Sequence, residues 1–206
     1  MRRQLSVPEG RDVVGFLGLL ADYQGVGDLL YAARRIVERR PQTHFLIMGY
    51  PGLEQYQRQA YDLQILDHVT FTGRVPYAQA PDYLSAADVA VSAKTSASEA
   101  NGKLLNYMAM GLPAVAYETP VAREILGDLG LFAPPGDVAA LAGAIERVLD
   151  DQQLRHELAG MLRARAERQF SWASFGHQLV QLYDRVCASS AGVPAARRWQ
   201  VAPRAD

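Results

Sequence analysis

The stretch TSASEANGKLLNYMAMGLPAVAYETP, residues 95–120, places charged side chains where a helix is expected to begin. Glu99 and Lys103 lie on either side of an Asn-Gly pair, and an apolar helical repeat follows. Gly102 lets a ligand approach the backbone closely, and the unpaired N–H groups of the first helical turn, around Lys103 and Leu104, form a site for a phosphate. The lysine adds a positive charge, so the pattern predicts an anion site.

Glu99 favours a different part of a ligand. Its ionised carboxylate repels a phosphate but accepts several hydrogen bonds, so it suits hydroxyl groups. A ligand with both phosphates and hydroxyls, such as a nucleotide sugar, would satisfy Glu99 and Lys103 together. The same residues also fit a structural interpretation, in which Glu99 interacts with the start of the helix and Gly102 is an ordinary helix-start glycine.

Strands and helices must position these side chains, and the sequence predicts both. Short apolar runs alternate with longer helical patterns, which indicates parallel strands joined by helical crossovers. The runs at 45–49 (FLIMG) and 89–93 (VAVSA) are apolar without alternation, as is typical of strands covered on both faces. After Asp137 the pattern becomes entirely helical. We predict an α/β domain with a doubly wound parallel sheet and C-terminal helices over residues 12–187.

The composition describes a globular chain without a strong overall charge. The 206 residues are 49% hydrophobic with a formal net charge of −1, so no general field attracts nucleic acid or a membrane surface. The single cysteine, Cys187, forms no internal disulfide, and no signal peptide or spanning segment is visible, so we expect a cytoplasmic protein. The 4 histidines lack metal-site spacing, and neither a metal nor another cofactor is expected. Residues 188–206 are small, polar and proline-bearing, and we expect a disordered tail.

The expected sheet also predicts where a ligand binds. In an open parallel sheet, ligands lie beyond the carboxyl ends of the strands, where loops lead into helix N-termini. This rule selects the segments GLLADYQGVG (18–27), GYPG (49–52), TGRVPY (72–77) and the stretch around Glu99. The first three contain Tyr23, Tyr50 and Tyr77, any one of which could stack on a base.

Several motifs occur in an order that resembles a known family. They are GLLADYQG, FLIMGYPG, VTFTGRVP, YLSAADVAVSA, SEANGKLLNYMAMGLPAVAYETP, REILGDLGLFAPPGD and a closing FSW. From about Gly10 to Arg185 the chain resembles the C-terminal nucleotide-binding domain of the family 4, group 1 glycosyltransferases of the GT-B fold. The resemblance implies a Rossmann-like half that holds a nucleotide-diphospho-sugar donor, opposite an N-terminal domain that binds the acceptor.

The resemblance also implies roles for single residues. Glu99 matches the first glutamate of the family's paired-glutamate motif, which contacts the donor sugar and stabilises charge at the anomeric centre. Asn106 stands near the second glutamate, which bonds the ribose hydroxyls, in a motif one residue shorter; its alternative is a helix residue facing solvent or the neighbouring loop. Arg74 and Val75 lie in the loop where the family reads the base through backbone atoms, and the Arg74 side chain is either solvated or a phosphate ligand.

The sequence departs from the family after Gly18, the glycine that ends the first strand. The family usually carries an arginine directly after this glycine and a lysine a few residues on, and the two hold the donor diphosphate. Leu19 and Gln24 occupy these positions, so both charges are missing. Three explanations stay open: a subgroup that uses Lys103 and backbone amides, a lipid-linked or differently charged donor, or a degenerate site.

The segment 1–11 resembles the short linker helix that precedes this domain in the family and is far below the roughly 50-residue minimum of an ordinary domain. We therefore predict the donor-binding half of a retaining glycosyltransferase, whose partner is a missing N-terminal domain or a separately encoded half. It is expected to be inactive alone, and whether the chain by itself is an enzyme stays open. The rival hypothesis is a non-catalytic relic or interaction module with a degenerate donor pocket. A nucleotide-sugar epimerase ranks third.

Overall fold

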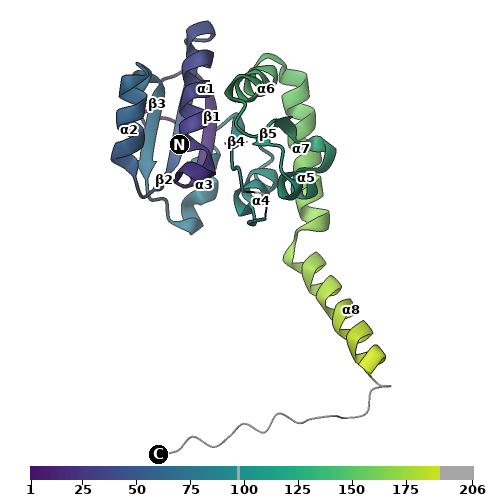
Figure 1. Ribbon diagram of the computed structural model, residues 1–206. Helices are drawn as coiled ribbons and strands as arrows, with labels where there is room; N and C mark the ends of the chain where they lie inside the picture. Colours follow the sequence, from purple (N-terminus) through teal and green to yellow (C-terminus); the bar gives the residue numbers. More distant parts are fainter. Residues whose placement is uncertain (97, 191–206) are drawn as a thin grey trace, which may run out of the picture. The chain divides into compact units, whose positions relative to one another are not determined.

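A single parallel sheet organises the chain. The computed structural model describes residues 1–96 and 98–190 (Figure 1). Six strands lie in the order β3-β2-β1-β4-β5-β6, and all neighbours are parallel. The strands are β1 (Asp12–Leu19), β2 (Thr43–Tyr50), β3 (Val69–Gly73), β4 (Val89–Ser92), β5 (Ala114–Tyr117) and β6 (Leu131–Ala133). The predicted doubly wound α/β fold is confirmed.

Helices cover both faces of this sheet (Figure 1). On one face, α1 packs against both α2 and α6; these are α1 (Val26–Arg39), α2 (Leu53–Asp62) and α6 (Val138–Asp150). The other crossovers carry α3 (Ala80–Leu84), α4 (Gly102–Ala109) and α5 (Pro120–Leu126), and α4 contacts β4, β5 and α5. Short 3-10 turns occur at η1 (Asp22–Gln24), η2 (Leu66–His68), η3 (Tyr77–Gln79) and η4 (Gly127–Leu129). Because both faces are covered, β2, β4 and β5 are buried almost throughout, as their unbroken apolar runs predict.

The two central strands, β1 and β4, separate toward their carboxyl ends. β1 pairs with β2 along its full length but with β4 only at Val14–Val89 and Gly15–Ala90. Beyond these pairs the buried Tyr107 of α4 connects the strands, because its hydroxyl accepts from Leu17 N (3.0 Å) and donates to Val91 O (3.1 Å). The strand order also reverses direction here, and such a switch point is where doubly wound sheets bind ligands.

A glycine lets the loop after β1 pack on the end of β4. Gly25 has φ +73, and a Cβ at this position would lie 1.9 Å from Ala93 O. The neighbouring loop is held by the bond from Thr95 N to Tyr23 O (3.1 Å). Both the left-handed backbone and the close contact therefore require glycine.

The N-terminal segment packs on the sheet domain. Residues 2–6 form turns rather than the expected linker helix, because Ser6 adopts φ 55 and Pro8 follows closely. The Arg2 guanidinium donates to Ala86 O (2.8 Å) and to Asp88 Oδ2 (2.7 Å), and Val7 is buried. These contacts join the segment to the start of β4.

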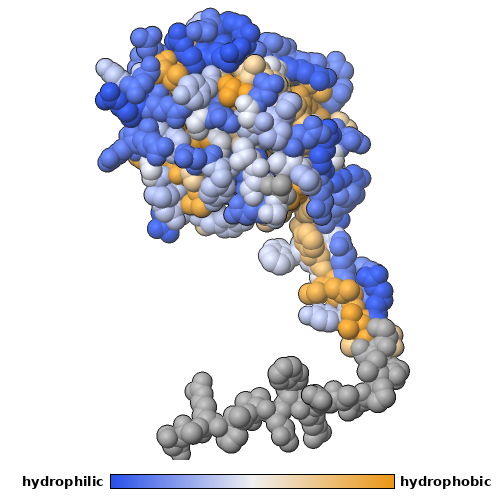
Figure 2. Space-filling model, in the orientation of Figure 1, coloured by the Kyte–Doolittle hydropathy of each residue, from blue (hydrophilic) through white to orange (hydrophobic). Residues whose placement is uncertain are grey.

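The chain divides into two compact units, residues 1–167 and the part from Arg168 on. α7 (Gln152–Gln169) ends near this boundary, and α8 (Trp172–Ser190) belongs to the second unit. Large hydrophobic side chains of α8 are exposed (Figure 2), namely Trp172, Phe175, Leu179, Val180, Leu182, Tyr183 and Val186. Among the described residues, no helix is both long and apolar enough to cross a membrane. Of the tail predicted from residue 188, the first three residues belong to α8 and 191–206 lie outside the described residues.

The contact of Gly25 generates a prediction about stability. Gly25→Ala should lower the free energy of unfolding by more than about 1 kcal/mol, because it forces a left-handed alanine against the Ala93 carbonyl. Urea denaturation of the variant measures this loss. The matched control is Gly143→Ala, in the middle of α6, where an added Cβ meets nothing within 4 Å and should be neutral or stabilising. Equal stability of the two variants would contradict the argument.

Candidate functional site

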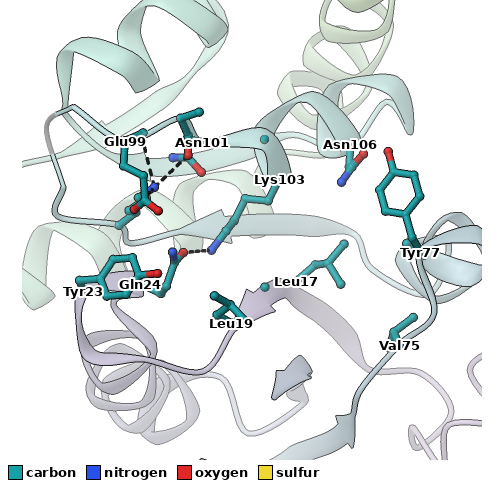
Figure 3. A pocket seen from close by; sticks show the side chains of 15 residues that line it. Leu17, Leu19, Tyr23, Gln24, Val75, Tyr77, Glu99, Asn101, Lys103 and Asn106 are labelled. Atoms are coloured by element: carbon teal, nitrogen blue, oxygen red, sulfur yellow. Dashed lines mark hydrogen bonds and ion pairs between the residues drawn. The ribbon is translucent and has the colours of Figure 1, made fainter. Parts of the chain in front are cut away.

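A pocket of about 310 Å³ opens at the carboxyl ends of β1 and β4 (Figure 3). Its walls come from the loop after β1, the loop after β3, the loop after β4 and the first turns of α4. Of the site residues predicted from the sequence, the lining includes Gly18, Val75, Glu99, Gly102, Lys103 and Asn106. Further lining residues are Leu17, Leu19, Tyr23, Gln24, Tyr77, Ala80, Lys94, Ala100 and Asn101.

The start of α4 is anchored to the end of β4 by a buried polar pair. Asn101 Nδ2 donates to Ser92 Oγ (3.0 Å), and Ser92 Oγ donates to Asn101 Oδ1 (3.1 Å). Gly102 then begins the helix at an exposed position. Leu104 differs from expectation, because its N–H donates to Asn101 O (3.0 Å) and its side chain is buried away from the pocket lining. The tight first turn therefore occupies a donor that the sequence analysis assigned to a phosphate.

Lys103 projects from α4 toward the loop after β1 (Figure 3). Its Nζ donates to Gln24 Oε1 (2.7 Å) and lies 4.2 Å from the centroid of the Phe16 ring. Gly18 makes room for this arrangement, since a Cβ there would lie 2.9 Å from the same Nζ. The ammonium is consequently held beside the end of β1 between a neutral amide and an aromatic face.

The pKa of Lys103 is lowered from 10.5 to about 7, mainly by burial and in part by the nearby Lys94, while Glu99 opposes the shift. The charged form is disfavoured because little water reaches the ammonium and, in residues 1–96 and 98–190, no carboxylate is bonded directly to it. An anion entering the pocket would supply the missing negative charge.

Lys94 is a site residue that the sequence analysis missed. It comes two residues after β4, and its side chain is only 3% exposed. Its Nζ lies 2.7 Å from Glu99 Oε2 and donates to Ala100 O (2.9 Å) and Glu99 O (3.3 Å). The rule that ligands bind at strand ends selects this position as well, but an isolated lysine after an apolar run shows no partner in the sequence.

Glu99 combines this buried partner with access to solvent. Its side chain is 54% exposed, and its N–H donates to Ser96 Oγ (3.3 Å). One carboxylate oxygen therefore contacts Lys94 while the side chain still borders the pocket.

The other predicted residues divide between the pocket and the surface around it. Asn106 lies opposite Tyr77, and Val75 lines the same side of the pocket (Figure 3). Arg74 is not part of the lining, and its guanidinium stacks 5.1 Å from the centroid of the Tyr50 ring. Within residues 1–96 and 98–190, no cluster of three or more histidine, cysteine or acidic side chains is arranged to hold a metal.

Fold and site together define a Rossmann-like α/β domain with a pocket at its topological switch point. The model of the family "Glycosyl transferases group 1" matches residues 1–165, and the chain belongs to this family. The chain is 32% identical over 190 residues to the phosphatidyl-myo-inositol mannosyltransferase of Mycolicibacterium smegmatis, covering 90% of this chain and 47% of that protein. It is also 32% identical over 159 residues to the 2-deoxystreptamine N-acetyl-D-glucosaminyltransferase of Streptomyces fradiae, covering 75% and 37% respectively.

Solved structures show the same architecture. Sucrose-phosphate synthase from Thermosynechococcus elongatus superposes with a TM-score of 0.79 at 28% identity, covering 92% of this chain and 49% of that one. Anabaena HepE in complex with UDP superposes at 0.80 with 23% identity, covering 89% and 51%. The chain thus spans 47% and 37% of the length of the two curated relatives above. The resemblance inferred from the sequence motifs is confirmed at the level of family and GT-B fold.

The environment of Lys103 predicts how stability depends on pH. Its folded pKa of about 7 lies below its ordinary 10.5, so the unfolded chain binds more protons between these values and raising the pH stabilises the fold. The free energy of unfolding of the wild type, minus that of Lys103→Met, should rise by less than about 1.4 kcal/mol per pH unit, since residual solvent discounts the shift. Urea denaturation at several pH values above neutrality measures the difference.

Arg58→Met provides the control, because it removes a cation paired with Asp62 on the exposed side of α2. Its difference from the wild type should stay constant over the same pH range. If the Lys103→Met curve ran parallel to that of the wild type, the lowered pKa would be refuted.

Proposed function

We propose that this chain is the donor-binding half of a retaining glycosyltransferase and that its pocket binds a nucleotide-diphospho-sugar. One observation carries the proposal: Lys103, whose ammonium is bonded to the neutral amide of Gln24, and the half-exposed carboxylate of Glu99 line one pocket at the switch point of a group 1 glycosyltransferase domain. The two groups match the two ends of such a donor, because phosphates need a cation and sugar hydroxyls need an acceptor.

The lining suggests an order for the parts of the donor. The diphosphate lies beside Lys103 and the backbone of Gly102, where an added Cβ would meet nothing within 4 Å. The sugar hydroxyls lie against Glu99, which also stabilises positive charge as it develops at the anomeric carbon. Asn106 bonds the ribose hydroxyls with a neutral amide.

In this proposal the base of the nucleotide lies against the loop that follows β3. Backbone atoms near Val75 read its edge, and the Tyr77 ring, which is 81% exposed, is available to stack on its face. In this proposal the donor binds without a metal.

Lys103 offers a replacement for the basic pair that the sequence lacks. Leu19 and Gln24 stand where the family usually carries an arginine and a lysine, and Gln24 is the residue that holds the Lys103 ammonium. The cation consequently reaches the end of β1 from α4 instead of from the loop after β1. This geometry favours a subgroup that uses Lys103 over a degenerate pocket.

The alternative function, a non-catalytic interaction module, is favoured by the loss of both usual cations. It differs from the main proposal in one measurable respect, since it requires no donor affinity. Calorimetry with UDP-glucose, other UDP-sugars and GDP-sugars separates the two. A folded domain that binds none of them at millimolar concentration would be a relic.

Variants of the two charged residues test the division of roles. Glu99→Ala should weaken binding of UDP-glucose and leave binding of UDP unchanged, because the carboxylate meets only the sugar. Lys103→Met should weaken binding of both ligands, because the ammonium meets the diphosphate. A charge-assisted contact is worth about 1.5–3 kcal/mol, or roughly 10- to 150-fold in affinity by calorimetry. Arg58→Met is again the control, and an equal loss for both ligands in both variants would refute this assignment.

Sugar transfer should require a second half. Holding the acceptor against the anomeric carbon accounts for about 7–11 kcal/mol of barrier lowering, and in this proposal the acceptor surface belongs to an N-terminal domain. With labelled donor, the chain alone should give no transfer to an acceptor beyond slow donor hydrolysis. Adding an N-terminal half, expressed from the frame upstream, should restore transfer. Robust transfer by the chain alone would overturn the half-enzyme proposal.

A further inference from the structure

Within the described residues, the ammonium of Lys94 makes its polar contacts with one loop, the loop that carries Glu99. A lysine ammonium has three N–H donors. Its Nζ contacts the Glu99 carboxylate at 2.7 Å, Ala100 O at 2.9 Å and Glu99 O at 3.3 Å. The Tyr23 ring, with its centroid 5.9 Å from Nζ, covers the same ammonium from the loop after β1. All three acceptors belong to two consecutive residues.

We propose that Lys94 is a positioning residue, which fixes the Glu99 carboxylate in the orientation that receives the donor sugar. This inference rests on the proposed function and adds a residue that acts through Glu99 instead of touching the sugar itself. No reaction step is assigned to Lys94.

Because Lys94 is buried, its ammonium requires the Glu99 carboxylate and the loop carbonyls as partners. An ammonium that is 3% exposed is stable only when its donors are satisfied and a negative charge lies close to it. The loop that carries Glu99 must therefore fold over Lys94, which brings Glu99 to the mouth of the pocket. Without that partner, a 54% exposed glutamate would sample several rotamers, and binding would have to order it.

The geometry also leaves Glu99 able to bind. Lys94 contacts Oε2, and among the described residues no other side chain is bonded to the carboxylate. Oε1 remains an acceptor for a sugar hydroxyl. The positive charge of Lys94 also reduces the repulsion between Glu99 and a diphosphate near Lys103, so one pocket accommodates both ends of the donor.

A double-mutant cycle tests the proposal with UDP-glucose and UDP as ligands. The quantity compared is the ratio of their affinities, which isolates the contribution of the sugar. Lys94→Met should lower this ratio about tenfold in the wild type, since the carboxylate loses its fixed orientation. In a Glu99→Ala background the same substitution should leave the ratio unchanged, because there is no carboxylate to position.

A merely structural role gives a different result. If Lys94→Met lowers the ratio equally in both backgrounds, or leaves it unchanged in the wild type, the proposal is overturned. Arg123→Met is the matched control, because it breaks an arginine–carboxylate pair with Glu118 outside the pocket and should leave the ratio unchanged.

A measurement without ligand covers the case in which Lys94→Met fails to fold. Nitrogen-15 NMR of the lysine ammonium groups should show a slowly exchanging Lys94 signal that shifts and exchanges faster in Glu99→Ala, a substitution of a half-exposed side chain. An unchanged signal overturns the proposal regardless of ligand binding. If the signal responds but no nucleotide sugar binds the wild type at millimolar concentration, the proposed function fails and Lys94 is purely structural.

Discussion

The hydroxyl of Tyr107 bridges β1 and β4 at the point where their pairing ends, and the pocket depends on this bridge. Two strands that separate leave backbone groups unpaired, and buried unpaired groups are costly. Tyr107 accepts from Leu17 N and donates to Val91 O, so both strands stay bonded while they diverge. Burial raises the pKa of Tyr107 well above its ordinary value, so the hydroxyl stays neutral and can donate. The same bridge anchors α4, the helix that presents Lys103 and Asn106 to the pocket.

Charge is distributed unevenly around this anchored helix. Lys94 is paired with Glu99, whereas Lys103 is bonded to the neutral amide of Gln24. The first pair is nearly neutral as a unit, whereas burial disfavours the charged form of Lys103 and lowers its pKa. An anion next to Lys103 would stabilise its charged form. The two lysines therefore have different electrostatic environments although they line the same pocket.

The chain belongs to a family with longer members, such as the mycobacterial mannosyltransferase. The group 1 model matches residues 1–165, and the chain covers 47% of the mycobacterial mannosyltransferase. A domain that binds a donor at strand ends supplies orientation and electrostatic stabilisation, whereas an acceptor needs a second surface opposite the pocket. The short loops after β1 and β4 are tied together by the contacts of Thr95 and Tyr23. These contacts hold two walls of the pocket together.

The sequence by itself determined the elements and the first outline of the site. Unbroken apolar runs such as 45–49 predicted buried parallel strands, and the helix start at Gly102 placed Glu99 and Lys103 at a strand end, because burial and capping leave local patterns. Only the tertiary structure decided which distant side chains meet. Sheet order brings Lys103 to Gln24, 79 residues earlier in the chain, and loop packing buries Lys94 beneath Glu99. Such pairs leave no periodic signal, since a lysine has the same sequence signature whether it is solvated, stacked or paired.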